Sequence, residues 1–242
     1  MKFAKSIPNL FTFLNLFFGC VAIVQGLKGD LFLLATFVLL GVVCDFFDGF
    51  FARILKVNSQ LGVQLDSLSD LVTFGITPSL VMFSYLSNSD FILENSSHNL
   101  IKFIPYLSFI ITIASSYRLA KFNLDNSLNH FKGLPTPANA LLIIFLPNVF
   151  EIDFLSNYIT FLENSFILIF IIIISSYLLI SNLEMPSLKL KGFFTVRNNF
   201  KGFNNRDIFL ILSGSLLIGF KLAAFPIIII IYILLSLFRI KF

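Results

Sequence analysis

Charge is scarce in this sequence. Of its 242 residues only 12% are Asp, Glu, Lys or Arg, whereas 57% are hydrophobic, and the mean hydropathy is +0.92. Soluble globular domains carry about a quarter charged residues and about half apolar ones, so an ordinary soluble domain is excluded. The long apolar runs instead predict an integral membrane protein. Its spans must be helices, because an irregular backbone in lipid cannot satisfy its own hydrogen bonds.

Cysteine and histidine are almost missing as well. The two cysteines, Cys20 and Cys44, both fall inside predicted spans, so we exclude a disulfide framework and interpret them as small apolar packing residues. The two histidines, His98 and His130, fall in predicted loops, and we assign them no catalytic role. The N-terminal segment "MKFAKSIPNLF" has the lysines of a signal peptide, but no clear cleavage site comes after it and many spans do. We therefore expect the first helix to be retained.

Apolar segments separated by polar or helix-breaking clusters predict about eight transmembrane helices. The expected spans are 8–27, 31–55, 61–87, 101–122, 134–150, 164–183, 207–220 and 222–240. The first six are near the ~20 residues needed to cross a bilayer. The last two are shorter, with Pro226 early in the eighth, and could form a single re-entrant hairpin instead. Since no segment is long enough to link two domains, we expect one all-α, polytopic membrane domain over residues 1–242.

The basic residues are placed asymmetrically along the chain. Of the 17 lysines and arginines, only Lys28, Lys102 and Lys221 fall in expected outer loops. This is the pattern of the positive-inside rule, and it predicts a multi-pass protein of the cytoplasmic (inner) membrane with both termini inside. The longest inner loop, 183–206, has basic residues interleaved with Phe and Leu. It is either a solvated loop or a surface for anionic lipid headgroups.

Four aspartates interrupt the apolar pattern within the stretch "CDFFDGFFARILKVNSQLGVQLDSLSD", from Cys44 to Asp70. Ionisable groups inside a membrane cost about 2.5–3.5 kcal/mol each on insertion scales, so they mark function. Ion pairing alone does not explain them, because the stretch has one arginine for four carboxylates. Oxygen-only ligands without His or Cys suit bound Mg²⁺ or Mn²⁺.

The spacing of these residues predicts a single site. Two helical stripes would face each other, one with Asp45, Asp48, Gly49 and Ala52 and the next with Gly62, Asp66 and Asp70. Glycine and alanine let a backbone or ligand approach closely. One or two metal ions and Arg53 would then hold a phosphate or pyrophosphate near the cytoplasmic face, and a further carboxylate could take a proton from a hydroxyl nucleophile. Because the site lies in the membrane, we expect a phosphorylated lipid as substrate.

These residues resemble a known signature. The CDP-alcohol phosphatidyltransferases carry D-x2-D-G-x2-A-R-x8-G-x3-D-x3-D, and every fixed position is matched here from Asp45 to Asp70. The resemblance implies a six-helix catalytic core, here 1–183, followed by two C-terminal helices over 207–240. It also implies a homodimer and transfer of a phosphatidyl group from CDP-diacylglycerol to an alcohol, with release of CMP and use of Mg²⁺ or Mn²⁺. The bilayer is the expected surrounding, and no nucleic-acid partner is expected.

The same resemblance implies roles for individual residues. Asp45, Asp48 and Asp66 would bind metal, and Asp70 would bind the second metal and act as general base. The nucleotide and diphosphate would be lined by Gly49, Ala52, Arg53 and Gly62.

Two further residues have two interpretations each. Ser59 would contact the lipid-linked phosphates or is an ordinary polar turn residue, and Asn9 would contact the nucleotide or caps the first helix.

Other stretches resemble the serine-specific branch of that family, the membrane-bound CDP-diacylglycerol–serine O-phosphatidyltransferases of bacteria. They are 6–23, 65–79, 117–123, 133–140 and 185–193. L-serine would be the acceptor, and Arg118 and Lys121 would hold its carboxylate, unless they are only positive-inside anchors. At position 121 this chain has lysine where arginine is frequent in that branch. Lysine keeps the positive charge but cannot bind a carboxylate through two parallel hydrogen bonds as arginine does.

Two alternatives stay open from the sequence. The same chemistry could use glycerol 3-phosphate, inositol or its phosphate, or choline as acceptor. A metal or proton transporter would instead spread its carboxylates across the membrane depth and show inverted repeats, whereas these aspartates cluster in one adjacent helix pair.

Overall fold

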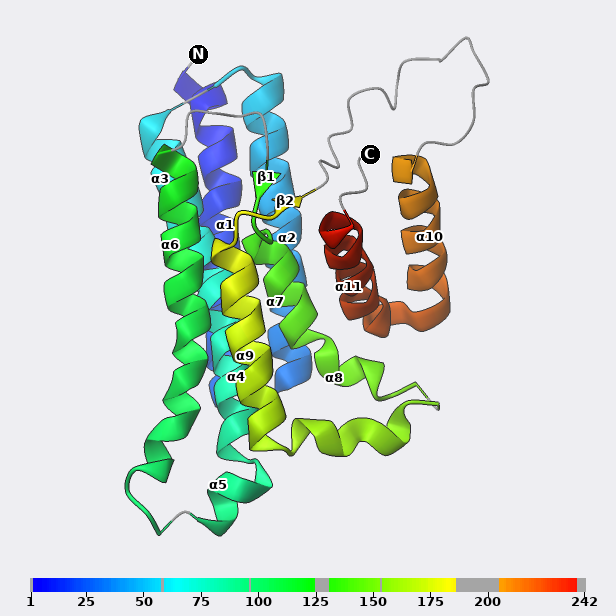
Figure 1. Cartoon of the computed structure of the whole chain (residues 1–242). Coiled ribbons are helices and arrows are strands. Elements are labelled where there is room, and N and C mark those ends of the chain that lie inside the picture. The colour runs from blue at the N-terminus through cyan, green and yellow to red at the C-terminus, as the bar shows by residue number, and fades with distance from the viewer. Residues whose placement is uncertain are drawn as a thin grey trace.

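The computed structural model describes residues 2–57, 59–95, 97–124, 131–152, 154–185 and 205–238, and nearly all of them are helical (Figure 1). The α-helices are α1 (Lys2–Leu27), α2 (Leu31–Ile54), α3 (Gln60–Asp70), α4 (Thr77–Ser87), α5 (Asp90–Glu94), α6 (Ile110–Leu124), α7 (Thr136–Ile144), α8 (Leu146–Val149), α9 (Ser165–Ile180), α10 (Asn205–Phe220) and α11 (Ala224–Leu237). The other helical elements are the π-helix η1 (Leu71–Ile76) and the 3₁₀-helices η2 (Ile101–Phe109), η3 (Ser156–Leu162) and η4 (Lys221–Ala223). Two short strands are β1 (Phe131–Lys132) and β2 (Glu184–Met185). The predicted all-α class is confirmed.

Several of these helices are long and apolar enough to cross a bilayer. Within the described residues the five candidate spans are Ile7–Leu27, Leu31–Ile54, Gln60–Ser87, Ile101–Leu124 and Asn205–Leu237. A sixth results if η3 and α9, which meet at 78°, count as one broken span. The chain is therefore a multi-pass membrane protein, and the first four candidates match the first four expected spans within a few residues.

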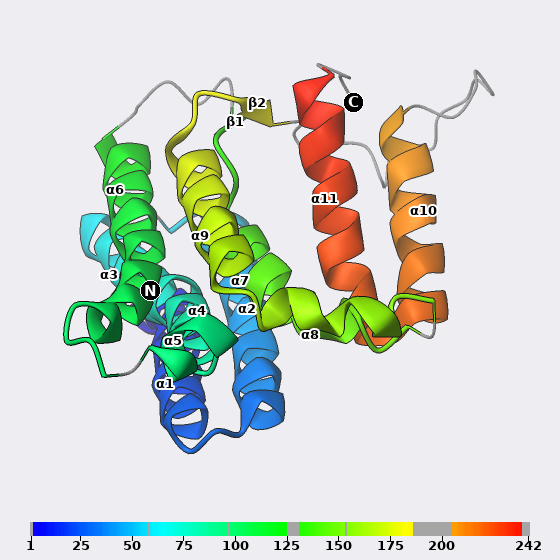
Figure 2. The same cartoon turned by 60° about the horizontal axis from the view of Figure 1, so that its bottom comes forward.

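The remaining expected spans are broken into shorter pieces. The segment expected over 134–150 consists of α7, with nine residues, and α8, with four, and α9 has 16 residues. Pro147 lies in the first turn of α8, which starts anew because proline cannot donate a hydrogen bond within a continuing helix. The last candidate span comprises α10, η4 and α11. The chain reverses at η4, so the two helices lie side by side as a hairpin (Figures 1 and 2).

Long segments run in alternating directions through the bundle (Figure 1). α1 packs along α2 and also contacts α3, η1 and α4, while α6 packs along α9. Large apolar side chains such as Phe17 and Phe170 are exposed on the outside, whereas Thr73, Thr77 and Ser79 are fully buried. This distribution is expected in lipid, where the surroundings are apolar and polar groups must find partners inside the protein.

A small antiparallel pairing ties the start of α7 to the end of α9. Phe131 pairs with Met185, and the Gly133 amide donates to the Leu183 carbonyl at 2.9 Å. Gly133 has φ +74°, and a Cβ there would lie 2.6 Å from the carbonyl oxygen of Leu179, so only glycine fits. β2 also contacts α11, because the backbone carbonyl of Glu184 accepts a hydrogen bond from the hydroxyl of a serine on that helix.

That hydroxyl belongs to Ser236, at 2.8 Å from the Glu184 carbonyl oxygen. A second apolar cluster, with Leu134, Leu178, Phe209 and Tyr232, packs α10 and α11 against α7 and α9. The hairpin is thus attached to the bundle on one side. Most of the predicted inner loop, residues 186–204, and the predicted loop residue His130 lie outside the described residues.

Candidate metal and phosphate site

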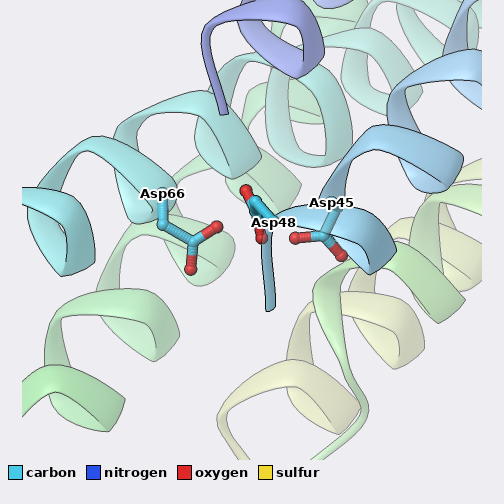
Figure 3. A group of neighbouring side chains, drawn as sticks. All are labelled: Asp45, Asp48 and Asp66. Carbon is cyan, nitrogen blue, oxygen red and sulfur yellow. The ribbon is translucent and has the colours of Figure 1, made fainter. Parts of the chain in front are cut away.

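Three aspartates from two helices converge at one end of the bundle. Asp45 and Asp48 lie one turn apart on α2, and Asp66 lies on α3. One carboxylate oxygen from each falls within 4.8 Å of the others, and Figure 3 shows the three side chains turned toward one another. The two helical stripes therefore meet, as their spacing predicts.

Asp70 stands outside this group of three. It is 7% exposed, and its Oδ1 accepts a hydrogen bond from Asn15 Nδ2 at 3.1 Å. Its charge interacts with those of Asp45 and Asp66, so it is a close neighbour of the triad. The structure brings all four predicted aspartates into one region, with Asp70 in contact with Asp45 of the triad and with Asn15.

The first helix holds one carboxylate from each partner helix. Thr12 is buried, and its hydroxyl donates to Asp48 Oδ2 at 2.9 Å. The Ser69 hydroxyl donates to the backbone carbonyl of Thr12 at 3.1 Å and so ties α3 to α1. Because α1 packs against both α2 and α3, it fixes the distance across which their carboxylates face each other.

The start of α3 is a capped helix end. Ser59 is the N-cap, with extended φ and ψ, and its Oγ accepts from the Gly62 amide at 2.9 Å. A Cβ on Gly62 would lie 2.8 Å from Ser59 Oγ and 3.3 Å from Asn9 Oδ1, so glycine leaves room for the cap and for the close approach of α1. Asn9 itself lies inside α1, which starts at Lys2, so the interpretation of Asn9 as a helix cap is wrong.

A cavity of about 130 Å³ lies beside the triad. It is lined by α1, by the end of α2 and by the start of α3, with contributions from Pro8, Asn9, Thr12, Asp48, Gly49, Ala52, Val57, Ser59, Gly62, Val63 and Asp66. Most of the residues predicted to bind the nucleotide or metal are thus on its wall. The small side chains leave room for a ligand next to the carboxylates.

The predicted cations are distributed unequally around the site. Arg118 is half-buried on α6, its charge interacts with that of Asp70, and its Nε is buried without a hydrogen-bond partner among the described residues. Arg53 is exposed, and its Nε donates to the Gly49 carbonyl at 2.8 Å, beside the cavity rather than on its wall. Lys121, one turn beyond Arg118, is exposed and does not line the cavity.

The triad fits a hard divalent cation. Its donors are carboxylate oxygens only, which Mg²⁺ and Mn²⁺ prefer. Asp66 Oδ1 is buried and has no hydrogen-bond partner among the residues that the structure describes. Within the described part of the chain no lysine or arginine forms an ion pair with the triad. Three clustered carboxylates with an unsatisfied buried oxygen are the arrangement that a bound cation would neutralise.

The comparisons with known proteins agree with this geometry. A model of the CDP-alcohol phosphatidyltransferase family matches residues 5–170. The chain belongs to the CDP-alcohol phosphatidyltransferase family. All four aspartates, Arg118 and the whole cavity wall fall within the matched range, whereas α10, η4 and α11 lie beyond it.

Individual members of the family are similar to this chain over most of their own length. A CDP-diacylglycerol–serine O-phosphatidyltransferase of Helicobacter pylori (strain J99) is 29% identical over 187 residues, covering 75% of this chain and 72% of that protein. One of Bacillus subtilis (strain 168) is 31% identical over 188 residues, covering 76% of this chain and 91% of that protein. A phosphatidylcholine synthase of Borreliella burgdorferi is 28% identical over 156 residues, covering 63% of this chain and 61% of that protein.

The sequence did not lead us to two residues of the site, Thr12 and Asn15, which contact Asp48 and Asp70. Both are polar side chains in the otherwise apolar first helix, and with Asn9 they recur every three residues on one face. A polar stripe within a membrane helix signals inward-facing partners. That signal was available, although it does not say which carboxylates the stripe contacts.

Proposed function

We propose that the protein transfers the phosphatidyl group of CDP-diacylglycerol to the hydroxyl of L-serine and releases CMP. The observation that carries this proposal is the triad of Asp45, Asp48 and Asp66 beside a small cavity inside a membrane protein of this family. The names of the bacterial relatives support serine as the acceptor.

The triad would bind Mg²⁺ or Mn²⁺, which supplies charge neutralisation for the diphosphate and for the leaving CMP. The cavity wall would hold the nucleotide end of the lipid, since Gly49, Ala52 and Gly62 present almost no side chain there. Arg53, at the mouth of this region, would add a positive charge for the diphosphate.

Asp70 is proposed as the general base. Its Oδ1 accepts a hydrogen bond from the Asn15 amide, which would orient the carboxylate to take the proton of the serine hydroxyl. The serine oxygen then forms a bond to the phosphorus that carries diacylglycerol, and the bond from that phosphorus to the CMP oxygen breaks. The products are phosphatidylserine and CMP.

Arg118 is proposed to hold the carboxylate of serine. It lies next to Asp70, as a residue binding the acceptor must, and its Nε has no partner within the described residues. A guanidinium binds a carboxylate through two parallel hydrogen bonds, which fixes orientation as well as position. The interpretation of Lys121 as a second carboxylate ligand receives no support from its exposed position.

We further propose that the site faces the cytoplasmic leaflet. The end of α2, the start of α3 and the C-terminal end of α6 lie at the same end of the bundle (Figure 1). The positive-inside rule assigns the basic residues of these segments to the inside. CDP-diacylglycerol would enter from the membrane with its acyl chains remaining in lipid.

The test is CMP release by the purified protein in mixed micelles of detergent and CDP-diacylglycerol. The acceptor panel contains L-serine, choline, glycerol 3-phosphate, inositol and inositol phosphate, with mass spectrometry of the lipid product. We expect release with serine and a phosphatidylserine product. Faster release with choline would favour the function named for the Borreliella relative. No CMP release with any acceptor, together with cation flux in liposomes, would revive the transporter alternative.

A further inference from the structure

Asn15 is an amide buried in the membrane part of the bundle. It is 0% exposed, and its Nδ2 donates to Asp70 Oδ1 at 3.1 Å. Its own Oδ1 is buried and has no hydrogen-bond partner among the described residues. A buried acceptor without a partner costs roughly 1–3 kcal/mol, and a leucine of similar size would avoid that cost. The amide is therefore poorly explained by packing alone.

The backbone of Asn15 is bound by a residue that follows Asp70 in the chain. Thr73 is fully buried in η1, the π-helical turn that begins directly after Asp70, and its hydroxyl donates to the Asn15 carbonyl at 3.0 Å. The Thr77 hydroxyl donates in turn to the Thr73 carbonyl. π-turns within α-helices occur frequently at functional sites. Asn15 is thus linked to this part of the chain twice, by its side chain to Asp70 and by its backbone carbonyl to Thr73.

Two glycines confine this pair of residues. A Cβ on Gly41 of α2 would lie 3.0 Å from Asn15 Oδ1 and 2.7 Å from Thr73 Cγ2. A Cβ on Gly19 of α1 would overlap the Thr73 hydroxyl. The absence of side chains at both glycines thus creates the space in which Asn15 and Thr73 lie. The backbone of Asn15 is held from η1, and its side chain lies against Gly41 of α2.

We propose that Asn15 is a positioning residue that holds one oxygen of Asp70 so that the other faces the acceptor hydroxyl. This inference rests on the proposed function, in which Asp70 takes the proton. It explains why α1 has an amide with an unpaired oxygen at this position, since the hydrogen bond that its Nδ2 donates to Asp70 has a function.

The test compares Asn15→Leu with Asn139→Leu in the full-length purified protein. Asn139 on α7 is also 0% exposed and accepts a hydrogen bond, from Ser175 at 2.7 Å, so its replacement removes a buried amide of the same kind away from the triad. We expect Asn15→Leu to lower kcat by roughly 10–100-fold, as loss of a positioning partner does. The KM for CDP-diacylglycerol and the affinity for Mn²⁺, measured by calorimetry, should stay unchanged. Asn139→Leu should lower the Tm similarly and keep kcat.

Several outcomes would overturn the proposal. A wild-type kcat in Asn15→Leu, or a loss of Mn²⁺ affinity in proportion to the loss of kcat, would show that Asn15 does not act through the base. An equal loss of kcat in Asn139→Leu would show a general packing effect. Failure of the proposed function is distinguished because the wild-type protein itself would then release no CMP with serine.

Gly41→Ala provides a second route if Asn15→Leu fails to fold. Its new methyl group would shift Thr73 and the Asn15 amide without removing either, so kcat should fall while Mn²⁺ affinity is kept. Its matched control is Gly214→Ala on α10, where a Cβ meets nothing within 4 Å. A wild-type kcat in Gly41→Ala would contradict the proposal.

Discussion

The glycines of the N-terminal helices and those of the C-terminal hairpin occupy very different surroundings. Gly19, Gly41 and Gly62 each have a polar side chain pressed against the position of the missing Cβ. Gly214 and Gly219 on α10 face open space. The same residue type thus makes room for a polar network in one region and adds only backbone freedom in the other. Gly19, Gly41 and Gly62 thus make room for the polar groups that surround the site.

The largest expected effect comes from metal binding by the aspartates of the site, in comparison with an aspartate of the C-terminal hairpin. Removal of divalent metal with EDTA should abolish CMP release, and Mg²⁺ or Mn²⁺ should restore it. Mn²⁺ at about 100-fold its Kd should stabilise the wild-type protein by about 2.7 kcal/mol, measured as a rise in Tm. Asp48→Asn should lose this stabilisation, whereas Asp207→Asn on α10 should keep it. An equal Mn²⁺ response in both variants would contradict the metal assignment.

Replacement of Asp70 by Asn keeps the shape of the side chain but removes the proposed base. We expect kcat to fall by roughly 10²–10⁴-fold, the range of general-base contributions. Binding of CDP-diacylglycerol should persist, because the nucleotide wall is formed by other residues. The measurement is single-turnover CMP release beside equilibrium binding of the lipid. Full turnover in this variant would remove Asp70 from the mechanism.

Arg118→Ala tests whether the acceptor lies beside Asp70. Loss of a charge-assisted contact worth about 1.5–3 kcal/mol should raise the KM for serine by roughly 10- to 100-fold. The KM for CDP-diacylglycerol should change little. Lys121→Ala is the matched control, since it removes a charge one turn further along α6 where the side chain is exposed. Equal effects of Arg118→Ala on both substrates would count against a role in serine binding.

The smallest expected effect tests the glycine comparison itself. Gly62→Ala should disturb the Ser59 cap and narrow the cavity, so stability should fall by about 0.5–2 kcal/mol and the KM for CDP-diacylglycerol should rise. Gly219→Ala, in the last turn of α10, should leave activity unchanged and should not lower stability, because a Cβ there meets nothing within 4 Å. Thermal unfolding and lipid titration of both variants measure the difference. Equal behaviour of the two would remove the distinction between the regions.

The convergence of the triad could be predicted from the sequence because helical periodicity fixes which side chains share a face. The first four spans were predictable because each is a long segment that is apolar over most of its length. The division of 134–150 into α7 and α8 and the 78° bend before α9 were not, because tertiary packing decides whether a short apolar segment continues straight.

The finer structure of the site depended on contacts between helices. Periodicity placed Arg118 and Lys121 on neighbouring turns of α6, but only the packed bundle shows that Arg118 approaches Asp70 while Lys121 is exposed. Thr12 and Asn15 could be recognised as a polar stripe, yet their partners lie 36 and 55 residues away in the chain. Sequence spacing describes one helix at a time and cannot assign such pairs.

The π-helical turn after Asp70 also makes chain length in this stretch part of the design of the site. Each added or removed residue rotates the remainder of a helix by about 100° around its axis. A deletion of one residue between Asp70 and Thr73 would turn these two side chains out of phase with each other. Evolution could therefore exchange many apolar side chains here more easily than it could change the number of residues.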